Sequence, residues 1–322
     1  LSIIDLDGGA QPLWNEEHDV ACVLNGEIYN FKALRAELES RGHKFRSGSD
    51  AEVIVHLYEE EGPDFADRLH GMFAIAVADF RGARGPELFL VRDRVGVKPL
   101  YWAATSEGGI AFASEPKALL AGGYGARRLR GSSLLDYLAL GWCGGPQAAW
   151  EGIERLQAGH RLQWSGALGA RVDCWWEPPL EPVDELPAED ELLSMIDEAV
   201  RSRLMSEVPL GAFLSGGVDS GAVVTSMSGF ADPLTCLSVG FTDKRFDELD
   251  LAQMTAQAAG ATHIKEVLDS EDGLGGADLA WHFDEPLADP STIPTYLVSR
   301  MAKKHVTVAL SGDGGDEIFA GY

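Results

Sequence analysis

The sequence predicts two domains, an α+β layered domain followed by an α/β domain with a doubly wound parallel sheet. In the first half, the apolar runs 72–79 (MFAIAVAD) and 87–92 (ELFLVR) flank a short turn, which is typical of an antiparallel hairpin. In the second half, short apolar runs alternate with helical patterns, which is typical of a parallel sheet. A proline-rich stretch separates the halves, so we expect domains over 1–165 and 188–322 joined by a linker over 166–187.

The first domain is expected to open on a strand. The run LSIID reads as a strand already under way without a leading Met, so we expect residues upstream of it. Residues 21–24 predict the next strand, and 31–41 predict a helix that stops at Gly42. Ser49 and Glu52 fit a capping box at the start of another helix.

The rest of this half is less regular. Residues 110–113 predict a further strand. Residues 122–182 are rich in Gly, Pro and Trp and are expected to be transitional, with a short helix over 132–140.

The second domain begins with a helix, because Leu192, Ile196, Val200 and Leu204 recur every four residues. After it, strands and helices alternate. The expected strands are 211–214, 235–241, 263–268 and 306–310, and the expected helices are 220 onwards, 249–259 and 293–304.

Composition narrows the class of protein. The 322 residues carry 26 basic and 51 acidic side chains, a net charge of −25, which argues against a nucleic-acid partner and against an anionic membrane surface. Cys22, Cys143, Cys174 and Cys236 form no CxxC pair and are expected to be buried thiols. With no apolar run of about 18 residues and no signal peptide, a reducing cytoplasm is the expected compartment.

The loop SGGVDS (residues 215–220) lies between an expected strand and an expected helix. This geometry points backbone N–H groups and a helix dipole at an anion, and Gly216 and Gly217 allow close approach. Ser215 and Ser220 add hydroxyl donors, and Asp219 suits a Mg²⁺ ion beside a phosphate. No Lys follows the glycines, so this is not the loop that holds a transferable γ-phosphate. The alternative is a plain tight turn with two glycines.

A second loop of the same kind, SGDGGDE (residues 311–317), follows the strand 306–310. Because parallel strands end at one sheet edge, the two loops are expected to lie side by side, with Asp219 and Asp316 sharing the Mg²⁺. The alternative is an acidic surface loop.

Longer motifs resemble a known family. The runs FLSGGVDS, SVGF, DEPLADPSTIPTY and LSGDGGDEIFAGY are similar to the synthetase domain of glutamine-hydrolysing asparagine synthetases. The runs NGEIYN, SGSDAEVI, GMFA, RDRVGVKPLYW and FASEPKALL are similar to the glutaminase domain of that family. Through ALGW and EVPLGAFLSGGVDS, the chain also resembles bacterial amidotransferases of exopolysaccharide- or exosortase-linked clusters.

The resemblance implies an N-terminal-nucleophile glutaminase sandwich (αββα) followed by an ATP-pyrophosphatase domain. It implies that ATP and Mg²⁺ activate a carboxylate, aspartate in the family, as an acyl adenylate, and that ammonia from glutamine forms the amide. The sequence leaves the oligomeric state open, a homodimer included.

Site residues follow from the same resemblance. Asn25 and Gly26 would form the oxyanion hole of the glutaminase, and Glu27 and Asp50 would bind the α-amino group of glutamine. In the synthetase domain, Asp313 stands where the family often has a Glu tied to formation of the intermediate. The implied ATP contacts are Leu214, Ser215, Gly216, Gly217, Asp219, Ser220, Val239, Ser311 and Gly312.

Arg92, Asp93 and Arg94, within the same family motif, are expected to form a structural ion network. A first-turn helix acid is the alternative reading of Asp50.

The chain departs from the family at both ends. The family's nucleophile is an N-terminal Cys, whereas residue 1 is Leu, and Ser2 lies in an expected strand. We therefore expect an internal fragment that does not hydrolyse glutamine as printed, because Cys22 is expected to be buried with a raised thiol pKa. The end of the synthetase domain, with its catalytic Lys, is also expected to be missing. Two alternatives remain: a β-lactam synthetase-like ligase with an inactive glutaminase, and a non-catalytic nucleotide-binding fragment.

Overall fold

The structure, a computed structural model, describes residues 3–83, 85–181, 186–242, 245, 247–268 and 276–321. The chain divides into two compact units, residues 1–181 with 280–289, and residues 182–279 with 290–322. Ser2 and residues 182–185 of the expected linker lie outside the described residues. Among the residues that the structure describes, no helix is both long enough and apolar enough to cross a membrane.

The first unit is built around a six-stranded antiparallel sheet with the order β1-β2-β3-β4-β8-β9 and a three-stranded sheet with the order β6-β5-β7. The elements are β1 (Leu13–Trp14), β2 (Val20–Ile28), α1 (Phe31–Ser40), α2 (Glu52–Glu61), a 3₁₀ helix (Gly62–Arg68), β3 (Gly71–Asp79), β4 (Glu87–Arg92), β5 (Tyr101–Ala104), β6 (Ile110–Ala113), α3 (Pro116–Ala121), α4 (Gly131–Leu140), β7 (Glu154–Arg155), β8 (His160–Ser165) and β9 (Gly169–Cys174).

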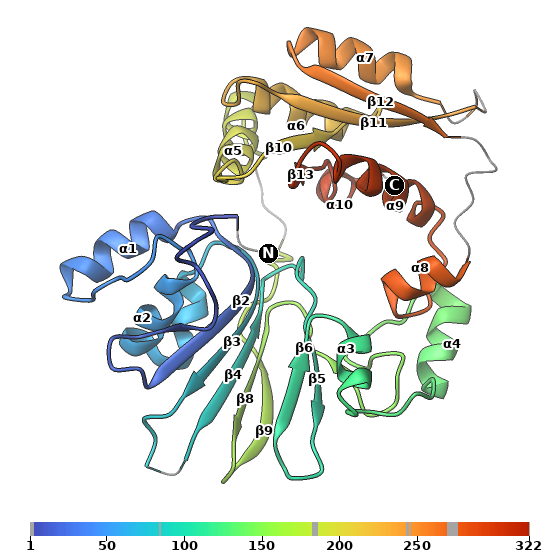
Figure 1. Ribbon diagram of the computed structural model, residues 1–322. Helices are drawn as coiled ribbons and strands as arrows, with labels where there is room; N and C mark the ends of the chain where they lie inside the picture. Colours follow the sequence, from blue (N-terminus) through green and yellow to red (C-terminus); the bar gives the residue numbers. More distant parts are fainter. Residues whose placement is uncertain are drawn as a thin grey trace. The chain divides into compact units, whose positions relative to one another are not determined.

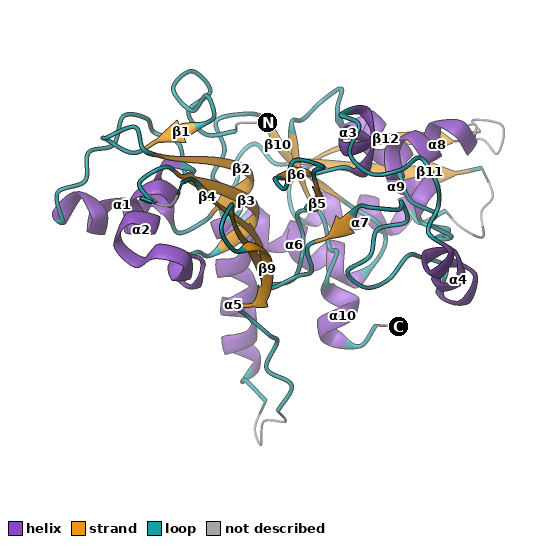
Figure 2. Cartoon of the chain, turned by 90° about the horizontal axis from the view of Figure 1, so that it is seen from below, coloured by secondary structure: helices purple, strands orange, loops and turns teal. Residues whose placement is uncertain are grey.

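The two sheets of this unit pack face to face. Leu90 and Leu162 from the large sheet share a core with Leu100, Trp102 and Ile110 from the small sheet and its edge. Helices α1 and α2 cover the other face of the large sheet, as Figures 1 and 2 both show. This order of helices, sheet and sheet is the layered α+β arrangement that the hairpin pattern predicts.

Two local predictions in this unit are wrong. Residues 3–5 are not a strand, because the Asp5 carboxylate accepts hydrogen bonds from the N–H groups of Gly8 and Gly48 and holds a turn there. The capping box is absent from α2, which begins at Glu52 without a side-chain cap. The Glu52 carboxylate instead accepts from the N–H groups of Arg46 and Ser47.

The stretch that we expected to be transitional contributes strands to the large sheet. Strand β8 pairs with β4, and β9 pairs with β8 in full register from His160↔Cys174 to Ser165↔Gly169. The first unit therefore extends past residue 165 into the expected linker. Cys174 lies exposed on this edge strand, whereas Cys22, Cys143 and Cys236 are buried, so the expectation of four buried thiols is wrong for Cys174.

A short segment of the second half also belongs to the first unit. Residues 280–289 cluster with it, and Glu285 fixes them there. The Glu285 carboxylate accepts from the Tyr101 hydroxyl (2.8 Å), the Ala149 N–H (2.6 Å) and the Arg155 guanidinium (2.5 Å). The motif DEPLAD, which resembles the synthetase domain, thus packs within the glutaminase-like unit.

The second unit holds a four-stranded parallel sheet with the order β12-β11-β10-β13. The elements are α5 (Glu189–Ser202), β10 (Leu210–Phe213), α6 (Val218–Ser228), β11 (Thr235–Phe241), α7 (Leu249–Ala258), β12 (Thr262–Leu268), α8 (Gly276–Phe283), which runs on into the first unit, α9 (Thr292–Ala302), β13 (Val308–Leu310) and α10 (Gly315–Phe319).

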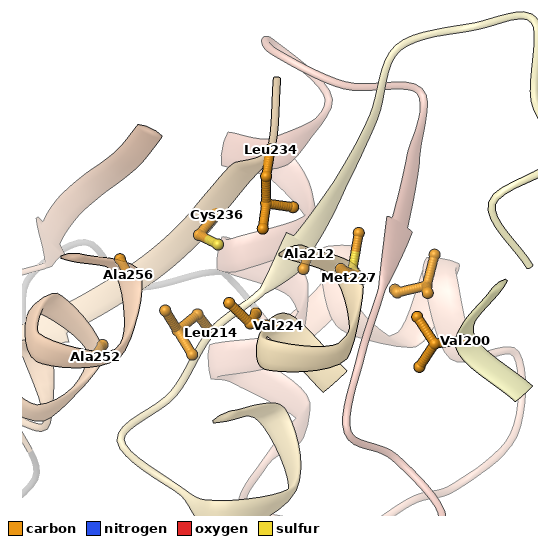
Figure 3. Packing of buried hydrophobic residues seen from close by; sticks show 10 residues of the cluster. Val200, Ala212, Leu214, Val224, Met227, Leu234, Cys236, Ala252 and Ala256 are labelled. Atoms are coloured by element: carbon orange, nitrogen blue, oxygen red, sulfur yellow. The ribbon is translucent and has the colours of Figure 1, made fainter. Parts of the chain in front are cut away.

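Helices cover both faces of this sheet. On one face, Ala212 and Cys236 pack with Val200 of α5, Val224 of α6 and Ala252 of α7, as Figure 3 shows. On the other face, Leu237 packs with Met301 and Ala302 of α9. Alternate strand residues thus serve opposite cores, which confirms the doubly wound parallel sheet.

Candidate active sites

The SGGVDS loop connects β10 to α6 and is ordered by its own serines. Ser215 Oγ and Ser220 Oγ lie 2.8 Å apart, and the Gly217 N–H donates to Ser215 Oγ (3.0 Å). Helix α6 begins at Val218 with Gly217 as its N-cap, two residues before the expected start. Asp219 therefore lies in the first helical turn, where the helix dipole favours negative charge.

The amide of Gly216 is already engaged. Its N–H donates to Glu248 Oε2 at 3.0 Å, and a Cβ at Gly216 would lie 2.8 Å from Glu248 Cβ. A carboxylate therefore occupies one of the N–H groups that the loop would offer to an anion. Glu248 was not among the predicted site residues, since a single acid before a helix gives no signal of this contact.

The two glycine-acid loops lie side by side, as predicted. Strand β13 pairs in parallel with β10 through Ala212↔Leu310, so both loops leave the same sheet edge. A Cβ at Gly312 would lie 2.7 Å from the Ser220 N, and a Cβ at Gly315 would lie 2.4 Å from Asp219 Cγ. Only glycine lets the second loop approach Asp219 this closely.

The remaining residues of the second loop are placed as follows. Ser311 Oγ donates to Asp313 Oδ2 at 2.9 Å, and Asp313 is exposed. Asp316 lies in the first turn of α10. Asp316 is the next residue after Gly315, which lies against Asp219. That Asp219 and Asp316 share a cation stays a prediction.

A cavity of about 230 Å³ opens at the carboxyl ends of β10 and β11. Leu214, Ser215, Gly216 and Val239, four of the predicted nucleotide contacts, line it together. The sequence reasoning missed the opposite wall, which Pro294, Thr295 and Val298 of α9 provide. The motif STIPTY contains the first two of these residues, so the resemblance carried a signal that was not used.

Ser238 lies at the base of this cavity and was also missed. Its hydroxyl donates to the Leu214 carbonyl (2.5 Å) and lies 2.7 Å from His263 Nε2. Burial, followed by the charge of Lys265, lowers the pKa of His263. Ser238 of β11 thus links His263 of β12 to Leu214, the residue before the SGGVDS loop.

In the first unit, Asn25, Gly26 and Glu27 lie consecutively near the end of β2. Gly26 has φ +147°, and a Cβ there would lie 2.0 Å from the Met72 carbonyl oxygen on β3. The Asn25 side-chain amide donates to Ser114 Oγ at 2.9 Å. Gly26 is thus required by the close approach of two strands, and Ser114 orients the Asn25 amide.

Cys22 lies on the same strand but is buried, with 1% of its surface exposed. Burial raises the pKa of its thiol well above the usual range, and the charges of Glu52 and Asp50 add to this effect. This confirms the expectation that Cys22 is a buried thiol with a raised pKa.

Asp50 is 7% exposed and lies next to the end of β2. Its Oδ2 accepts from the Ile28 N–H at 2.8 Å. Burial raises the pKa of its carboxyl, and the N–H groups of Ile28, Asp50 and Ala51 partly offset that rise. The structure thus brings Asp50 to the strand that carries Asn25, Gly26 and Glu27.

The predicted ion network of Arg92, Asp93 and Arg94 is wrong. The Arg92 guanidinium donates to the carbonyls of Gly96, Lys98 and Leu156. Asp93, 1% exposed, accepts from three backbone N–H groups, and Arg94 donates to two further carbonyls. These side chains bond to main-chain groups of the turn after β4, of the neighbouring segment 67–73 and of Leu156, which is a structural role.

Comparison with known proteins agrees with this geometry. Residues 1–176 match the model of the glutamine amidotransferase domain, and residues 191–322 match the model of asparagine synthase. The chain is 36% identical to asparagine synthetase [glutamine-hydrolyzing] 1 of Bacillus subtilis, over 100% of this chain and 51% of the relative. It is 33% identical to asparagine synthetase B of Escherichia coli, over 100% of this chain and 56% of the relative.

The chain spans about half the length of these curated relatives. Both domain models match in the order that the motifs predict, and together they cover both units. The chain belongs to the family of glutamine-hydrolysing asparagine synthetases.

Proposed function

We propose that this chain provides the glutaminase-type and adenylating parts of a glutamine-dependent amidotransferase of the asparagine synthase type. The reaction activates a carboxylate with ATP, releases pyrophosphate and forms an amide with ammonia taken from glutamine, leaving AMP. Aspartate is the acceptor that the family name suggests. The observation that carries the proposal is the contact of Asp219 with Gly315 at one sheet edge, beside a cavity lined by Leu214 and Val239.

The nucleotide would bind at the carboxyl ends of β10 and β11. Apolar side chains of the cavity, with the backbone of Leu214 and Val239, suit the adenine ring and ribose. The SGGVDS loop, with Ser215, Gly217 and the start of α6, suits the phosphates, because helix N-termini and glycine amides bind anions. Ser311 and Gly312 would contact the nucleotide from the second loop.

The donor set at this edge fits a Mg²⁺ ion. Asp219 and Asp316 supply carboxylate oxygens, which Mg²⁺ prefers, and glycines keep the space beside Asp219 free of side chains. When bound, Mg²⁺ offsets the charge of the phosphates. Asp313, which is exposed and accepts a hydrogen bond from Ser311 Oγ, is the residue that we propose for formation of the acyl adenylate.

The glutamine site would lie at the end of β2. The Asn25 side-chain amide and the Gly26 N–H are the proposed donors to the oxyanion that forms when the amide carbon of glutamine is attacked. Glu27 and Asp50 are the proposed ligands of the α-amino group. Burial makes the ionised form of the Asp50 carboxyl less stable. A nearby ammonium group stabilises that ionised form, so Asp50 suits a cationic partner.

An isotope experiment tests this function directly. The protein at its natural length is supplied with ATP, Mg²⁺, aspartate and glutamine labelled with ¹⁵N in the side-chain amide. We expect the label in the amide of the product. An unlabelled, cyclised product would support the β-lactam synthetase-like alternative, and no nucleotide turnover with any carboxylate would support a non-catalytic protein.

Replacing Asp50 by Asn should separate binding from stability. We expect KM for glutamine to rise by about 100-fold or more, because a buried charged partner of the α-amino group is lost. Burial raises the pKa of Asp50, so above that pKa the ionised carboxyl lowers the free energy of unfolding of the parent. The Asn variant lacks this charge and should be at least as stable as the parent at pH 7. The stability difference should narrow as pH falls through the raised pKa.

Urea unfolding at several pH values and glutaminase kinetics check both parts. Asp67→Asn is the matched control, because Asp67 is an exposed acid of the same unit. An unchanged KM in Asp50→Asn would exclude Asp50 from the glutamine site.

Replacing Glu248 by Gln should strengthen nucleotide binding. The Glu248 carboxylate competes with phosphate for the Gly216 N–H, and hydrogen bonds to charged groups contribute about 1.5–3 kcal/mol before solvent screening. We expect a roughly threefold to tenfold lower Kd for Mg·ATP, measured by calorimetry. Asp250→Asn, an exposed acid in the first turn of α7, is the control for net charge. Weaker binding in Glu248→Gln would mean that Glu248 contributes to the site instead.

A further inference from the structure

Two histidines and two glutamates converge in the first unit, and none of them belongs to the candidate active sites. Glu16, His43, His56 and Glu59 each present one nitrogen or oxygen atom, and these four atoms lie within 4.8 Å of one another. His56 and Glu59 lie one helical turn apart on α2, His43 follows α1, and Glu16 follows β1. We refer to these four residues as the His–Glu cluster.

The distances between the histidine nitrogens and the glutamate oxygens of the His–Glu cluster are close to the edges of a tetrahedral metal site, with Glu16 presenting a different oxygen to each histidine. His56 Nδ1 lies 3.2 Å from Glu16 Oε2 and 3.4 Å from Glu59 Oε2. His43 Nδ1 lies 3.6 Å from Glu16 Oε1 and 3.7 Å from Glu59 Oε2. In a tetrahedral zinc site with bonds of about 2.0–2.2 Å, neighbouring ligand atoms lie about 3.3–3.6 Å apart. A single zinc ion can therefore reach all four side chains after small adjustments.

Hydrogen bonding alone does not account for this arrangement. His43 Nδ1 is beyond hydrogen-bond distance of both cluster carboxylates. His56 is fully buried, and its Nδ1, the nitrogen that faces the cluster carboxylates, makes one long hydrogen bond (3.4 Å) with Glu59 Oε2. A buried imidazole that faces two carboxylates is costly unless it is paired or coordinates a metal.

The carboxylates of the cluster are held in place by other donors. Glu59 Oε1 accepts from the side-chain amide of Asn15 at 2.7 Å, which leaves Oε2 facing the histidines. Glu16 Oε1 accepts from the Lys44 N–H at 2.7 Å. These contacts orient the ligands before any ion binds, as outer partners do in metal sites.

The far nitrogens of the two histidines face acids as well. His43 Nε2 lies 3.1 Å from Glu60 Oε1, and His56 Nε2 lies 3.8 Å from Glu52 Oε1. The hydrogen bond with Glu60 places the proton of His43 on Nε2 and leaves its Nδ1 free to bind a metal, whereas Glu52 lies beyond hydrogen-bond distance of His56 Nε2. A cleft lined by Glu16, His43 and Glu59, about 560 Å³ in volume, gives an ion access from solvent.

We propose that the His–Glu cluster is a structural zinc site with four protein ligands. Imidazole and carboxylate ligands suit Zn²⁺, and the charges of Glu16 and Glu59 balance those of the ion. Four protein ligands leave no open position, so the site is structural and not catalytic. The ion would join the segment after β1, the segment after α1 and the helix α2, and so stabilise the helical layer of the first unit.

The test uses the chain stripped of metal with a chelator and then titrated with Zn²⁺ against a chromogenic competitor. We expect one equivalent of tightly bound zinc, a higher melting temperature with zinc, and the intense visible bands of four-coordinate cobalt when Co²⁺ replaces it. Glu59→Gln and His43→Ala should each lower zinc affinity by at least about 100-fold, since even outer partners contribute about 10–100-fold.

The control is Glu17→Gln, a neighbouring exposed glutamate outside the cluster, which should bind zinc as the parent does. Glu59→Gln keeps the side-chain volume and an oxygen for Asn15, so it remains informative if His43→Ala does not fold. Failure of the parent to bind one equivalent would overturn the proposal. Binding that is unaffected by Glu59→Gln, or that is lost equally in Glu17→Gln, would also overturn it.

Discussion

Replacing Asp219 by Asn or Ala is expected to lower ATP-dependent amide synthesis by about a thousandfold or more, because several kcal/mol of charge stabilisation by a metal would be lost. Glutamine hydrolysis should remain, since Asp219 belongs to the second unit and the proposed glutamine site to the first. Asn keeps the packing of Asp219 against Gly315, so its effect reports the charge and not the shape.

The measurement is made on the protein at its natural length, with ammonia release and AMP formation assayed separately in the same samples. Glutaminase activity then serves as the internal control for folding. Equal loss of both activities in Asp219→Asn would contradict two sites with separate chemistry, and unchanged synthesis would remove Asp219 from the metal site.

Replacing Gly26 by Ala should be the most destructive single change in the first unit. The added Cβ would overlap the Met72 carbonyl oxygen at 2.0 Å, and φ of +147° is unfavourable for alanine. We expect a loss of about 3 kcal/mol or more in the free energy of unfolding, because backbone strain adds to a main-chain overlap. Glutaminase activity should fall with it, since the proposed oxyanion donor moves.

Gly42→Ala is the matched control for this change. Gly42 also has a positive φ, +107°, but a Cβ there would meet nothing within 4 Å. It should therefore cost only about 1 kcal/mol of conformational strain. Urea unfolding followed by circular dichroism compares the two variants. Similar stabilities would show that the close approach of β2 and β3 is not what makes Gly26→Ala destabilising.

The parts of the fold that depend on local pattern could be predicted from the sequence. Strand β11 was expected over its true bounds, residues 235–241, because an apolar run between turn residues leaves few alternatives. The parallel sheet followed from strand–helix alternation. Strand β9 was missed because its side chains are mostly exposed and carry no apolar alternation, and β8 was missed because Leu162 is its one buried residue.

Contacts between residues far apart in the sequence could not be predicted from local pattern. Residues 280–289 read as part of the second half, but Tyr101, Ala149 and Arg155, which are far away in the sequence, hold Glu285 in the first unit. The start of the chain shows the same limit on a small scale, because Asp5 prefers bonds to Gly8 and Gly48 over a strand.

The residues of the candidate sites likewise fall into those that the sequence could predict and those that it could not. Residues carried by contiguous motifs, such as Ser215 and Ser220, could be placed from the sequence alone. Partners from other elements could not, as Glu248 and Ser238 illustrate. The His–Glu cluster draws its members from three separate segments, and its only sequence signal is the spacing of His56 and Glu59 on one helix.

Identification of the nucleotide product tests the central claim most directly, because two glycine-acid loops without a P-loop lysine predict cleavage between the α- and β-phosphates. With ATP, Mg²⁺, glutamine and aspartate, the protein at its natural length should form AMP and pyrophosphate in amounts equal to the amide. Formation of ADP and inorganic phosphate in step with the amide would contradict the account.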